Sequence, residues 1–319
     1  MSGNADATLC DMTLHELHDM LLSGQVSSRE ITSDVLARID EVEASVGAYV
    51  TRDRETALKG ADAADEVIAR ARRDRDTGAI GALVGIPVVL KDNVCTRGMR
   101  TTCCSKMLED FIPTYDAAVT ARLREAGAVI VGKGNMDEFA MGSTTQTSVF
   151  HVTRNPWDLE RVPGGSSGGC AAAVAAGEAV ASIGTDTGGS IRQPASFCGV
   201  VGLKPTYGRV SRYGVVAFAS SLDTVGPITR DVRDCAIMLK AIAGRDGRDS
   251  TSAPDAVPDY VEHVDRGVQG LKVGIPEEFF GPGMSDGVRA VVERALRALE
   301  DAGADIVEVS LPLVEHALA

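Results

Sequence analysis

Two clusters of glycine and serine, joined by an alanine-rich run, constrain this chain more than any other feature. The clusters are residues 164–169 and 186–190, and the run between them extends over residues 171–181. The run predicts a short helix followed by a strand. Glycine adopts positive φ and lets other groups approach the backbone closely. Each cluster can therefore hold a serine hydroxyl near several N–H groups, as nucleophilic serine chemistry requires. A pair of flexible loops is the alternative interpretation.

Strand and helix patterns alternate through the rest of the chain. The continuous apolar run at residues 83–90 predicts a strand buried on both faces, and it ends at Lys91. Residues 116–126 then predict a helix, and residues 129–131 a second buried strand. The same order recurs at residues 272–275, 286–302 and 305–309. This alternation predicts an α/β fold in which helices cover a sheet.

Amphipathic helices are predicted at residues 13–22, 28–43 and 51–75, with a further helix at residues 231–243. The first begins with Thr13 and Glu16 at the spacing of a capping box. The second places apolar residues on one face, namely Ile31, Val35, Leu36 and Ile39.

The composition limits the class of protein. A chain of 319 residues with 44% hydrophobic residues can form one large domain or two smaller ones. No apolar run reaches the length of a membrane span, and residues 1–12 lack the pattern of a signal peptide. We therefore expect a soluble cytoplasmic protein without a membrane partner. The net charge of −13 argues against a broad phosphate-binding surface.

No metal site is expected. The seven cysteines show no Cys-x-x-Cys spacing and are interpreted as buried thiols. His15 and His18 lie three residues apart on a predicted helix, as metal ligands could, but no third ligand is evident. We interpret both as surface or capping residues.

A nucleophilic serine needs a base, and the sequence offers few. Residues 164–169 match the nucleophile-elbow pattern, which requires a downstream acid and then a histidine. Only His263 and His316 follow, neither in a glycine-rich structured context, so a Ser-His-Asp triad is disfavoured. Lys91 is the other candidate, because burial after an apolar run would lower its pKa. A lysine that extends to solvent is an equally good interpretation from the residues alone.

The segments at residues 88–93, 164–169 and 184–194 together resemble the amidase signature family, and the resemblance extends over nearly the whole chain. It implies an α/β fold with a mixed, mostly parallel central sheet and helices on both faces. Residues 1–77 would form an N-terminal helical layer and residues 78–319 the catalytic core of a single domain. The sequence stops soon after a predicted strand, so we expect it to be truncated at the C-terminus.

The resemblance also implies a Ser–Ser–Lys triad. Ser190 matches the acyl-enzyme nucleophile, Ser166 the bridging serine after a cis peptide bond, and Lys91 the base. The oxyanion hole would use the backbone N–H groups of Thr187, Gly188, Gly189 and Ser190. Further residues expected to bind substrate or support the site are Met141, Gly142, Ser167 and Asp186. Arg192 is expected to brace the loop rather than to bind substrate.

Flanking segments at residues 134–142, 153–158 and 204–214 resemble the A subunits of tRNA-dependent amidotransferases in particular. This implies that the chain hydrolyses glutamine and passes ammonia to a B subunit, which uses ATP and Mg²⁺ and binds Glu-tRNA(Gln), with a C subunit completing a heterotrimer. The sequence leaves open whether Glu-tRNA(Gln), Asp-tRNA(Asn) or both serve as acceptor, and no cofactor is expected on this chain. Glutamine recognition is expected in the missing C-terminal part. The alternatives are a stand-alone amidase and a silent scaffold, of which the scaffold needs none of the triad residues.

Overall fold

The computed structural model describes residues 8–281 and 283–316. The expectations for the two chain ends, at residues 1–12 and at the C-terminus, lie partly outside this range. The chain divides into two compact units, Met1–Val261 and Glu262–Ala319. The last predicted strand–helix–strand segment belongs to the second unit, and the single domain stays a prediction.

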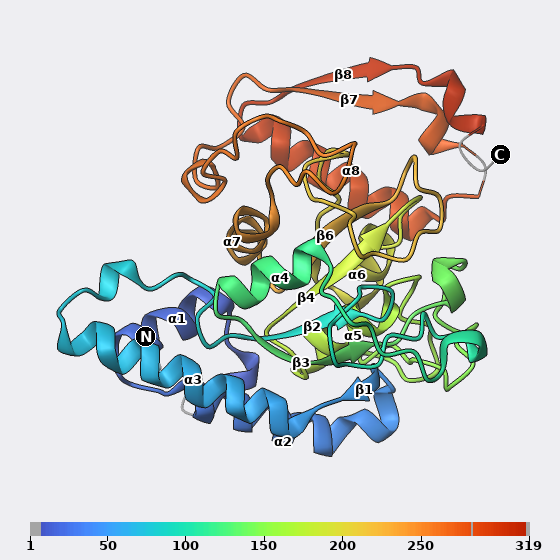
Figure 1. Ribbon diagram of the computed structural model, residues 1–319. Coiled ribbons are helices and arrows are strands. Elements are labelled where there is room, and N and C mark those ends of the chain that lie inside the picture. The colour runs from blue at the N-terminus through green and yellow to red at the C-terminus, as the bar shows by residue number, and fades with distance from the viewer. Residues whose placement is uncertain (1–7, 282, 317–319) are drawn as a thin grey trace. The chain divides into compact units, whose positions relative to one another are not determined.

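Among the described residues of the larger unit, six strands form one sheet in the order β1-β3-β2-β4-β6-β5 (Figure 1). Their bounds are β1 Tyr49–Arg52, β2 Pro87–Lys91, β3 Val129–Gly134, β4 Ala181–Asp186, β5 Val201–Gly202 and β6 Thr224–Thr229. β2 pairs in parallel with β3 and with β4, whereas β1, β6 and β5 pair antiparallel with their neighbours. Because β5 is antiparallel to β6 and β6 to β4, the strands β2, β3, β4 and β5 all run in one direction. The predicted mixed, mostly parallel sheet is confirmed.

The helices of this unit are α1 Leu14–Ser23, α2 Ser28–Val46, α3 Arg54–Arg73, α4 Ala118–Glu125, α5 Gly168–Ala176, α6 Arg192–Cys198 and α7 Val232–Ile242. The capping box at Thr13 and Glu16 is confirmed. The predicted helix at residues 51–75 is wrong at its start. Tyr49–Arg52 forms strand β1 instead, and the Asp53 side chain begins α3 by accepting from the N–H of Thr56.

Both faces of the sheet are covered. Every residue of β2, β3, β4 and β6 is buried. α5 packs on β2, β3 and β4, while α3 packs on β3 and α7 on β6. The seven cysteines are free thiols and all are buried, as predicted. The central strands of the sheet are therefore wholly buried beneath helices.

His15 belongs to a helix-capping network. The Asp234 carboxylate accepts from the N–H groups of Leu14 at 2.7 Å and His15 at 3.0 Å, and from His15 Nδ1 at 2.8 Å. Asp231 lies close enough to His15 and Asp234 for the three side chains to hold a metal ion together. Its carboxylate caps α7 by accepting from the N–H of Asp234 at 2.8 Å. Asp234 is the capping group here, and His15 is one of its donors.

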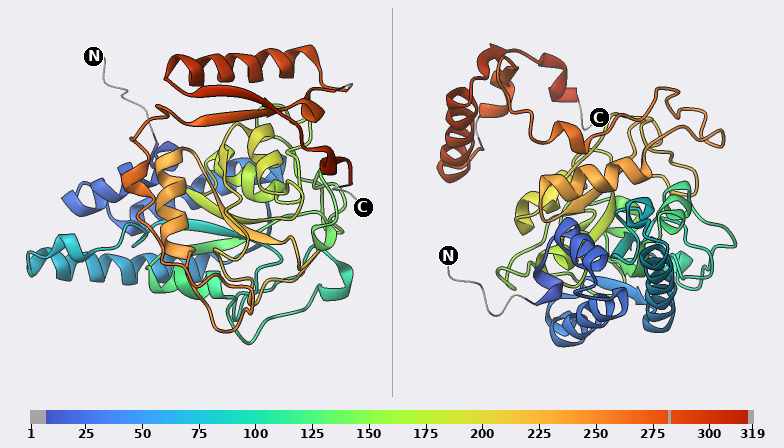
Figure 2. Two further views of the ribbon diagram at one scale, coloured as in Figure 1. Left: turned by 90° about the horizontal axis from the view of Figure 1, so that it is seen from above. Right: turned by 90° about the vertical axis from the view of Figure 1, so that its left-hand side faces the viewer.

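The smaller unit contains the second predicted strand–helix–strand segment, which is confirmed as β7 Lys272–Pro276, α8 Asp286–Asp301 and β8 Asp305–Val309. In its described residues β7 and β8 pair in parallel as a sheet of their own, with α8 against β8 (Figure 2). Short 3-10 helices occur at Leu9–Asp11, Thr77–Ala79, Lys106–Leu108, Glu138–Ala140, Val261–His263, Glu277–Phe280 and Pro312–His316. Across both units, no helix in the described residues has the length and apolar character to span a bilayer.

Candidate active site

The topology of the sheet brings the predicted site residues together. β2 and β4 are parallel neighbours, with Leu90 opposite Ile183. Parallel strands end at the same edge of a sheet, so Lys91 at the end of β2 lies beside the end of β4. The glycine–serine cluster at residues 186–190 continues from β4, and the cluster at residues 164–169 leads into α5, which packs on both strands.

Lys91 is fully buried and its ammonium group faces three oxygen atoms. Nζ donates to Ser166 Oγ at 2.7 Å, to Thr185 Oγ1 at 3.0 Å and to the Thr185 carbonyl at 3.4 Å. Asn93 Nδ2 also donates to Thr185 Oγ1, at 3.2 Å. Thr185 has no predicted role in the sequence. The sequence feature that could have identified Thr185 is its position on β4 directly before Asp186, where its side chain contacts Lys91 at the end of β2.

Burial sets the protonation state of Lys91. Desolvation lowers its pKa from 10.5 to about 8, although the Cys170 thiol, Asp137 and Asp186 act in the opposite direction. At neutral pH about one amine in ten is therefore uncharged and able to accept a proton. The interpretation of Lys91 as a solvent-extended lysine is wrong, because the side chain is 0% exposed.

The two serines differ in exposure. Ser166 follows a cis peptide bond from Gly165, as predicted, and is 0% exposed, whereas Ser190 is 9% exposed. The N–H of Ser167 donates to the Ser190 carbonyl at 3.1 Å, which joins the two clusters directly. In the described part of the chain no hydrogen bond joins the Ser166 and Ser190 hydroxyls. Ser190 is therefore the less buried of the two serines.

Ser167 holds the Thr185 backbone in place beside Lys91. Its Oγ donates to the Thr185 carbonyl at 3.1 Å, the same carbonyl that faces Lys91 Nζ. Its hydroxyl oxygen also lies 3.4 Å from the N–H of Thr185. Ser167 therefore fixes the strand position that supplies acceptors to Lys91, which agrees with the supporting role expected for it.

Asp186 organises the turn that carries Ser190. Its carboxylate accepts from the N–H of Gly189 at 2.8 Å and forms two hydrogen bonds with Arg192, from Nε at 3.1 Å and from Nη2 at 2.9 Å. Arg192 thus braces the loop, as expected. Burial raises the pKa of Asp186, but Arg192 and the N–H of Ile191 bring it below its ordinary value.

The predicted oxyanion hole needs one correction. The N–H of Gly189 is already bound by the Asp186 carboxylate. A charged acceptor at this distance holds an amide firmly, so Gly189 cannot offer the same N–H to a substrate oxygen. Thr187, Gly188 and Ser190 are the predicted members that are left.

Replacing Asp186 by alanine is expected to lower the free energy of unfolding by about 3 kcal/mol, because buried N–H groups and a guanidinium lose their acceptor. Urea unfolding at pH 7 measures the change. Arg192→Ala is the matched comparison and should cost about 1 kcal/mol, since the Arg192 side chain is 53% exposed. Equal losses in the two variants would show that the ion pair, rather than the amide contacts, carries the effect.

Met141 and Gly142 lie in a loop that wraps around Asp137. The Asp137 carboxylate accepts from the N–H groups of Thr144 at 3.1 Å and Thr145 at 2.9 Å. A Cβ atom on Gly165 would lie 2.1 Å from Asp137 Oδ2, so this carboxylate packs against the cis peptide. Met141 is 57% exposed. The role predicted for Met141 and Gly142 stays a prediction, and Asp137 is a neighbour that sequence reasoning missed.

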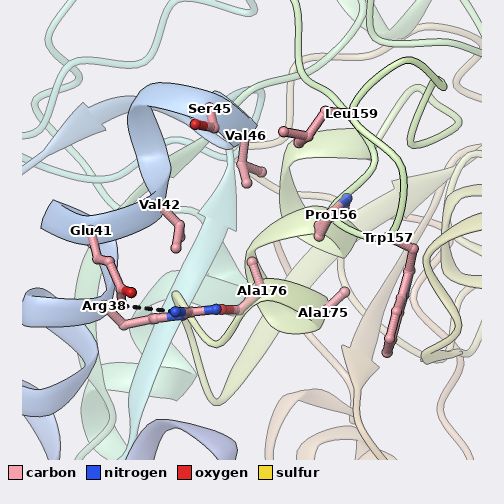
Figure 3. A pocket seen from close by; sticks show the side chains of 10 residues that line it. All are labelled: Arg38, Glu41, Val42, Ser45, Val46, Pro156, Trp157, Leu159, Ala175 and Ala176. Atoms are coloured by element: carbon pink, nitrogen blue, oxygen red, sulfur yellow. Dashed lines mark hydrogen bonds and ion pairs between the residues drawn. The ribbon is translucent and has the colours of Figure 1, made fainter.

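A groove away from this site is lined by α2, the end of α5 and the segment around Trp157 (Figure 3). Arg38 spans it, donating to Glu41 Oε2 and to the Ala176 carbonyl, each at 2.8 Å. None of the predicted site residues lines this groove. It is not a part of the candidate active site.

Comparisons with known proteins agree with this geometry. Residues 30–319 match a family model described as Amidase. The A subunit of glutamyl-tRNA(Gln) amidotransferase from Moorella thermoacetica is 61% identical over 307 residues, which cover 96% of this chain and 62% of the relative. The corresponding protein of Syntrophus aciditrophicus is 58% identical over 311 residues, covering 98% of this chain and 63% of the relative.

Solved structures are similar as well. The crystal structure of the A subunit of glutamyl-tRNA(Gln) amidotransferase from Thermotoga maritima has a TM-score of 0.84 and 45% identity, covering 98% of this chain and 64% of that one. Native peptide amidase from Stenotrophomonas maltophilia has a TM-score of 0.85 and 37% identity, covering 96% of this chain and 63% of that one. The chain spans less than two thirds of the length of each of these relatives.

Proposed function

Because this chain belongs to the amidase family, we propose that it is the component of a tRNA-dependent amidotransferase that hydrolyses glutamine and releases ammonia. One observation carries the chemistry: the buried Lys91 Nζ lies 2.7 Å from Ser166 Oγ, and the N–H of the next residue, Ser167, donates to the Ser190 carbonyl. The names of the curated relatives support the choice of an amidotransferase.

The reaction uses a proton relay. Neutral Lys91 accepts a proton from Ser166 while Ser166 accepts one from Ser190, and Ser190 Oγ forms a bond to the carboxamide carbon. N–H groups of Thr187, Gly188 and Ser190 stabilise the resulting oxyanion. When the C–N bond breaks, the relay runs backwards and the leaving nitrogen departs as ammonia. Water then hydrolyses the acyl-enzyme by the same sequence of proton transfers.

The difference in exposure supports this division of roles. Ser190 is 9% exposed and can meet a substrate, whereas Ser166 and Lys91 are 0% exposed and exchange protons only with neighbours. Excluding water from the base keeps its pKa near neutrality. A serine that is wholly buried beside a lysine suits a bridge rather than a nucleophile.

Transfer of the ammonia is assigned to partner subunits. A B subunit would bind Glu-tRNA(Gln), or Asp-tRNA(Asn), and activate the terminal carboxylate with ATP and Mg²⁺, and a C subunit would complete the heterotrimer. The net charge of −13 supports a division in which the partner holds most of the tRNA. Met141 and Gly142, on the loop beside the cis peptide, are proposed to contact the substrate.

A stand-alone amidase is the second candidate. The likeness to a peptide amidase, at 37% identity, favours it, because the proposed triad does not depend on a partner. The two candidates share every step at Ser190 and differ in the amide they accept and in the fate of the ammonia.

One experiment separates the candidates. Full-length protein is incubated with glutamine and Glu-tRNA(Gln), with and without the B and C subunits, and acid-quenched samples are analysed by mass spectrometry. We expect a γ-glutamyl adduct on the Ser190 peptide and amidated tRNA only in the complex. An adduct formed from simple amides but never from glutamine would favour the stand-alone amidase. No adduct under any condition would favour a scaffold.

A further inference from the structure

We propose that Asp223 is a positioning residue for the turn that carries Ser190 and that it acts through the hydroxyl of Thr187. The inference rests on the proposed function of Ser190 as nucleophile. It extends the site to a residue on the opposite side of the turn from Asp186, on a loop that precedes β6.

Strand register places the two residues side by side. β4 and β6 are antiparallel, and Asp186 at the end of β4 lies opposite Thr224 at the start of β6. In an antiparallel pair, the residue after one partner lies beside the residue before the other. Thr187 therefore meets Asp223 directly beyond the last pair of the ladder, where the two strands separate.

Asp223 accepts hydrogen bonds from two donors of its own loop and from one donor of another segment. Its carboxylate accepts from the N–H groups of Phe218 at 2.9 Å and Ala219 at 3.2 Å, and it is only 6% exposed. These two bonds fix the carboxylate within its own loop. The third donor is the Thr187 hydroxyl, which comes from a different segment. The carboxylate, held by its own loop, thus anchors Thr187.

The anchor matters because two glycines come directly after Thr187. Gly188 has no neighbour within 4 Å of an added Cβ, and Gly189 has φ of +131°. Two glycines in this arrangement leave the peptide planes little restraint of their own. Asp186 holds the Gly189 end of the turn, and Asp223 holds the Thr187 end. Between them the N–H groups of Thr187 and Gly188 are kept in one orientation.

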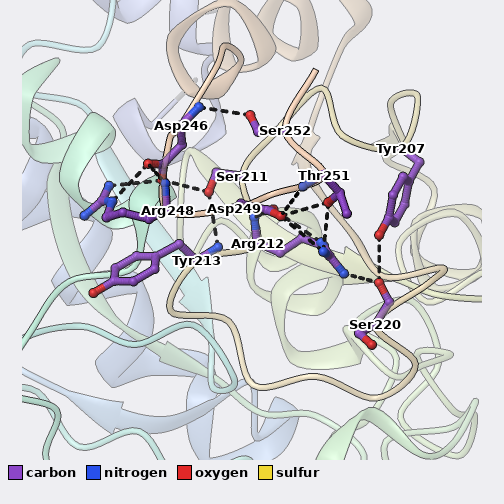
Figure 4. A network of polar contacts seen from close by, with 10 residues as sticks. All are labelled: Tyr207, Ser211, Arg212, Tyr213, Ser220, Asp246, Arg248, Asp249, Thr251 and Ser252. Atoms are coloured by element: carbon purple, nitrogen blue, oxygen red, sulfur yellow. Dashed lines mark hydrogen bonds and ion pairs between the residues drawn. The ribbon is translucent and has the colours of Figure 1, made fainter. Parts of the chain in front are cut away.

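The loop that carries Asp223 is itself tied down from behind. Arg212 donates to the Ser220 carbonyl and forms an ion pair with Asp249, from Nη2 to Oδ1 at 3.2 Å. Tyr207 Oη donates to the same Ser220 carbonyl at 2.8 Å. Figure 4 shows these side chains converging on the loop from two sides. The Asp223 carboxylate is thereby attached to a braced loop rather than to a free one.

The test compares Thr187→Val, Asp223→Asn and the double variant in the full-length enzyme. The probes are glutamine, for the rate of acyl-enzyme formation, and a fluorophosphonate reagent, for labelling of Ser190. Because the labelling needs no knowledge of the natural amide, it tests the positioning role even if glutamine is not hydrolysed. Asp246→Asn is the matched control, since Asp246 accepts from Ser211 in the adjoining network and does not contact the turn.

We expect each single variant to label and acylate about tenfold to a hundredfold more slowly, at unchanged KM, because a misplaced turn weakens the oxyanion contacts. The double variant should lose no more than a single one, and Thr187→Ser should restore the rate. Additive losses, or losses matched by Asp246→Asn at equal melting temperature, would overturn the positioning role. If Ser190 is labelled normally but no glutamine adduct forms, the proposed substrate is wrong. The labelling rates of the variants then still test the positioning role of Asp223.

Discussion

Ser190→Ala is expected to abolish the γ-glutamyl adduct and to lower glutamine hydrolysis by a factor on the order of 10⁴ or more. The alanine variant has no oxygen to bond to the carboxamide carbon, and losses of this size follow removal of a serine nucleophile from a relay that acts as a unit. The measurement is single-turnover hydrolysis of glutamine with mass spectrometry of the quenched enzyme.

Ser182→Ala is the matched control for this loss. Ser182 is a buried serine on β4, the strand that leads into the turn of Ser190, and its Oγ donates to the Cys170 carbonyl at 3.2 Å. It makes no hydrogen bond to the proposed triad in the described residues. Substantial activity in Ser190→Ala, or an adduct that moves to Ser166, would mean that the nucleophile has been assigned to the wrong serine.

Lys91→Met is expected to lower the acylation rate by about 10³-fold or more, because the relay loses its terminal base. In the unsubstituted enzyme, kcat/KM should rise tenfold per pH unit up to the pKa of Lys91, about 8, and stay level above it. Lys91→Arg keeps a buried cation but cannot give up its proton. It should be as inactive as the methionine variant, whereas an active arginine variant would assign Lys91 an electrostatic role.

Lys91→Met, although it lowers activity, should not lower the free energy of unfolding at pH 7. Desolvation lowers the pKa of Lys91 from 10.5 in the unfolded chain to about 8 in the fold, so between these values the unfolded state binds more protons. Stability therefore rises with pH over this window, and below pH 8 the fold carries the full penalty of about 3 kcal/mol. Lys91→Met removes that penalty. Unfolding in urea at pH 7 should show a variant at least as stable as the parent.

Much of the fold was predictable because local pattern and tertiary structure agree. Ile31 and Val35 on α2 and the apolar residues of β2 are buried as their spacing predicts. The alanine-rich, charged pattern of residues 51–75 predicts a helix that includes Thr51 and Arg52. Their strand state depends on pairing with β3, a segment some eighty positions away in sequence, and a local pattern carries no information about such a partner.

The candidate site likewise contains residues that sequence motifs identify and residues that only the structure identifies. Lys91, Ser166 and Ser190 are identified by motifs, and the cis peptide before Ser166 was expected from the resemblance. The use of the Gly189 amide by Asp186 could not be predicted, because four consecutive N–H groups look equivalent until the carboxylate is placed. Thr185 and Asp223 were missed for a related reason. Each is an ordinary polar residue in the sequence, and its partner lies on another segment.

The pairing of β2 with β4 fixes the backbone around Lys91 independently of the loop around Met141. Adjacent strands of a sheet lie about 4.8 Å apart whatever their side chains, so main-chain hydrogen bonds fix the backbone positions from which the Lys91 and Thr185 side chains meet. The segment around Met141 is a loop and makes no strand pairing in the described residues. If Met141 and Gly142 contact the substrate as proposed, sequence changes in that loop would alter which amide is accepted and leave the contacts of Lys91 in place.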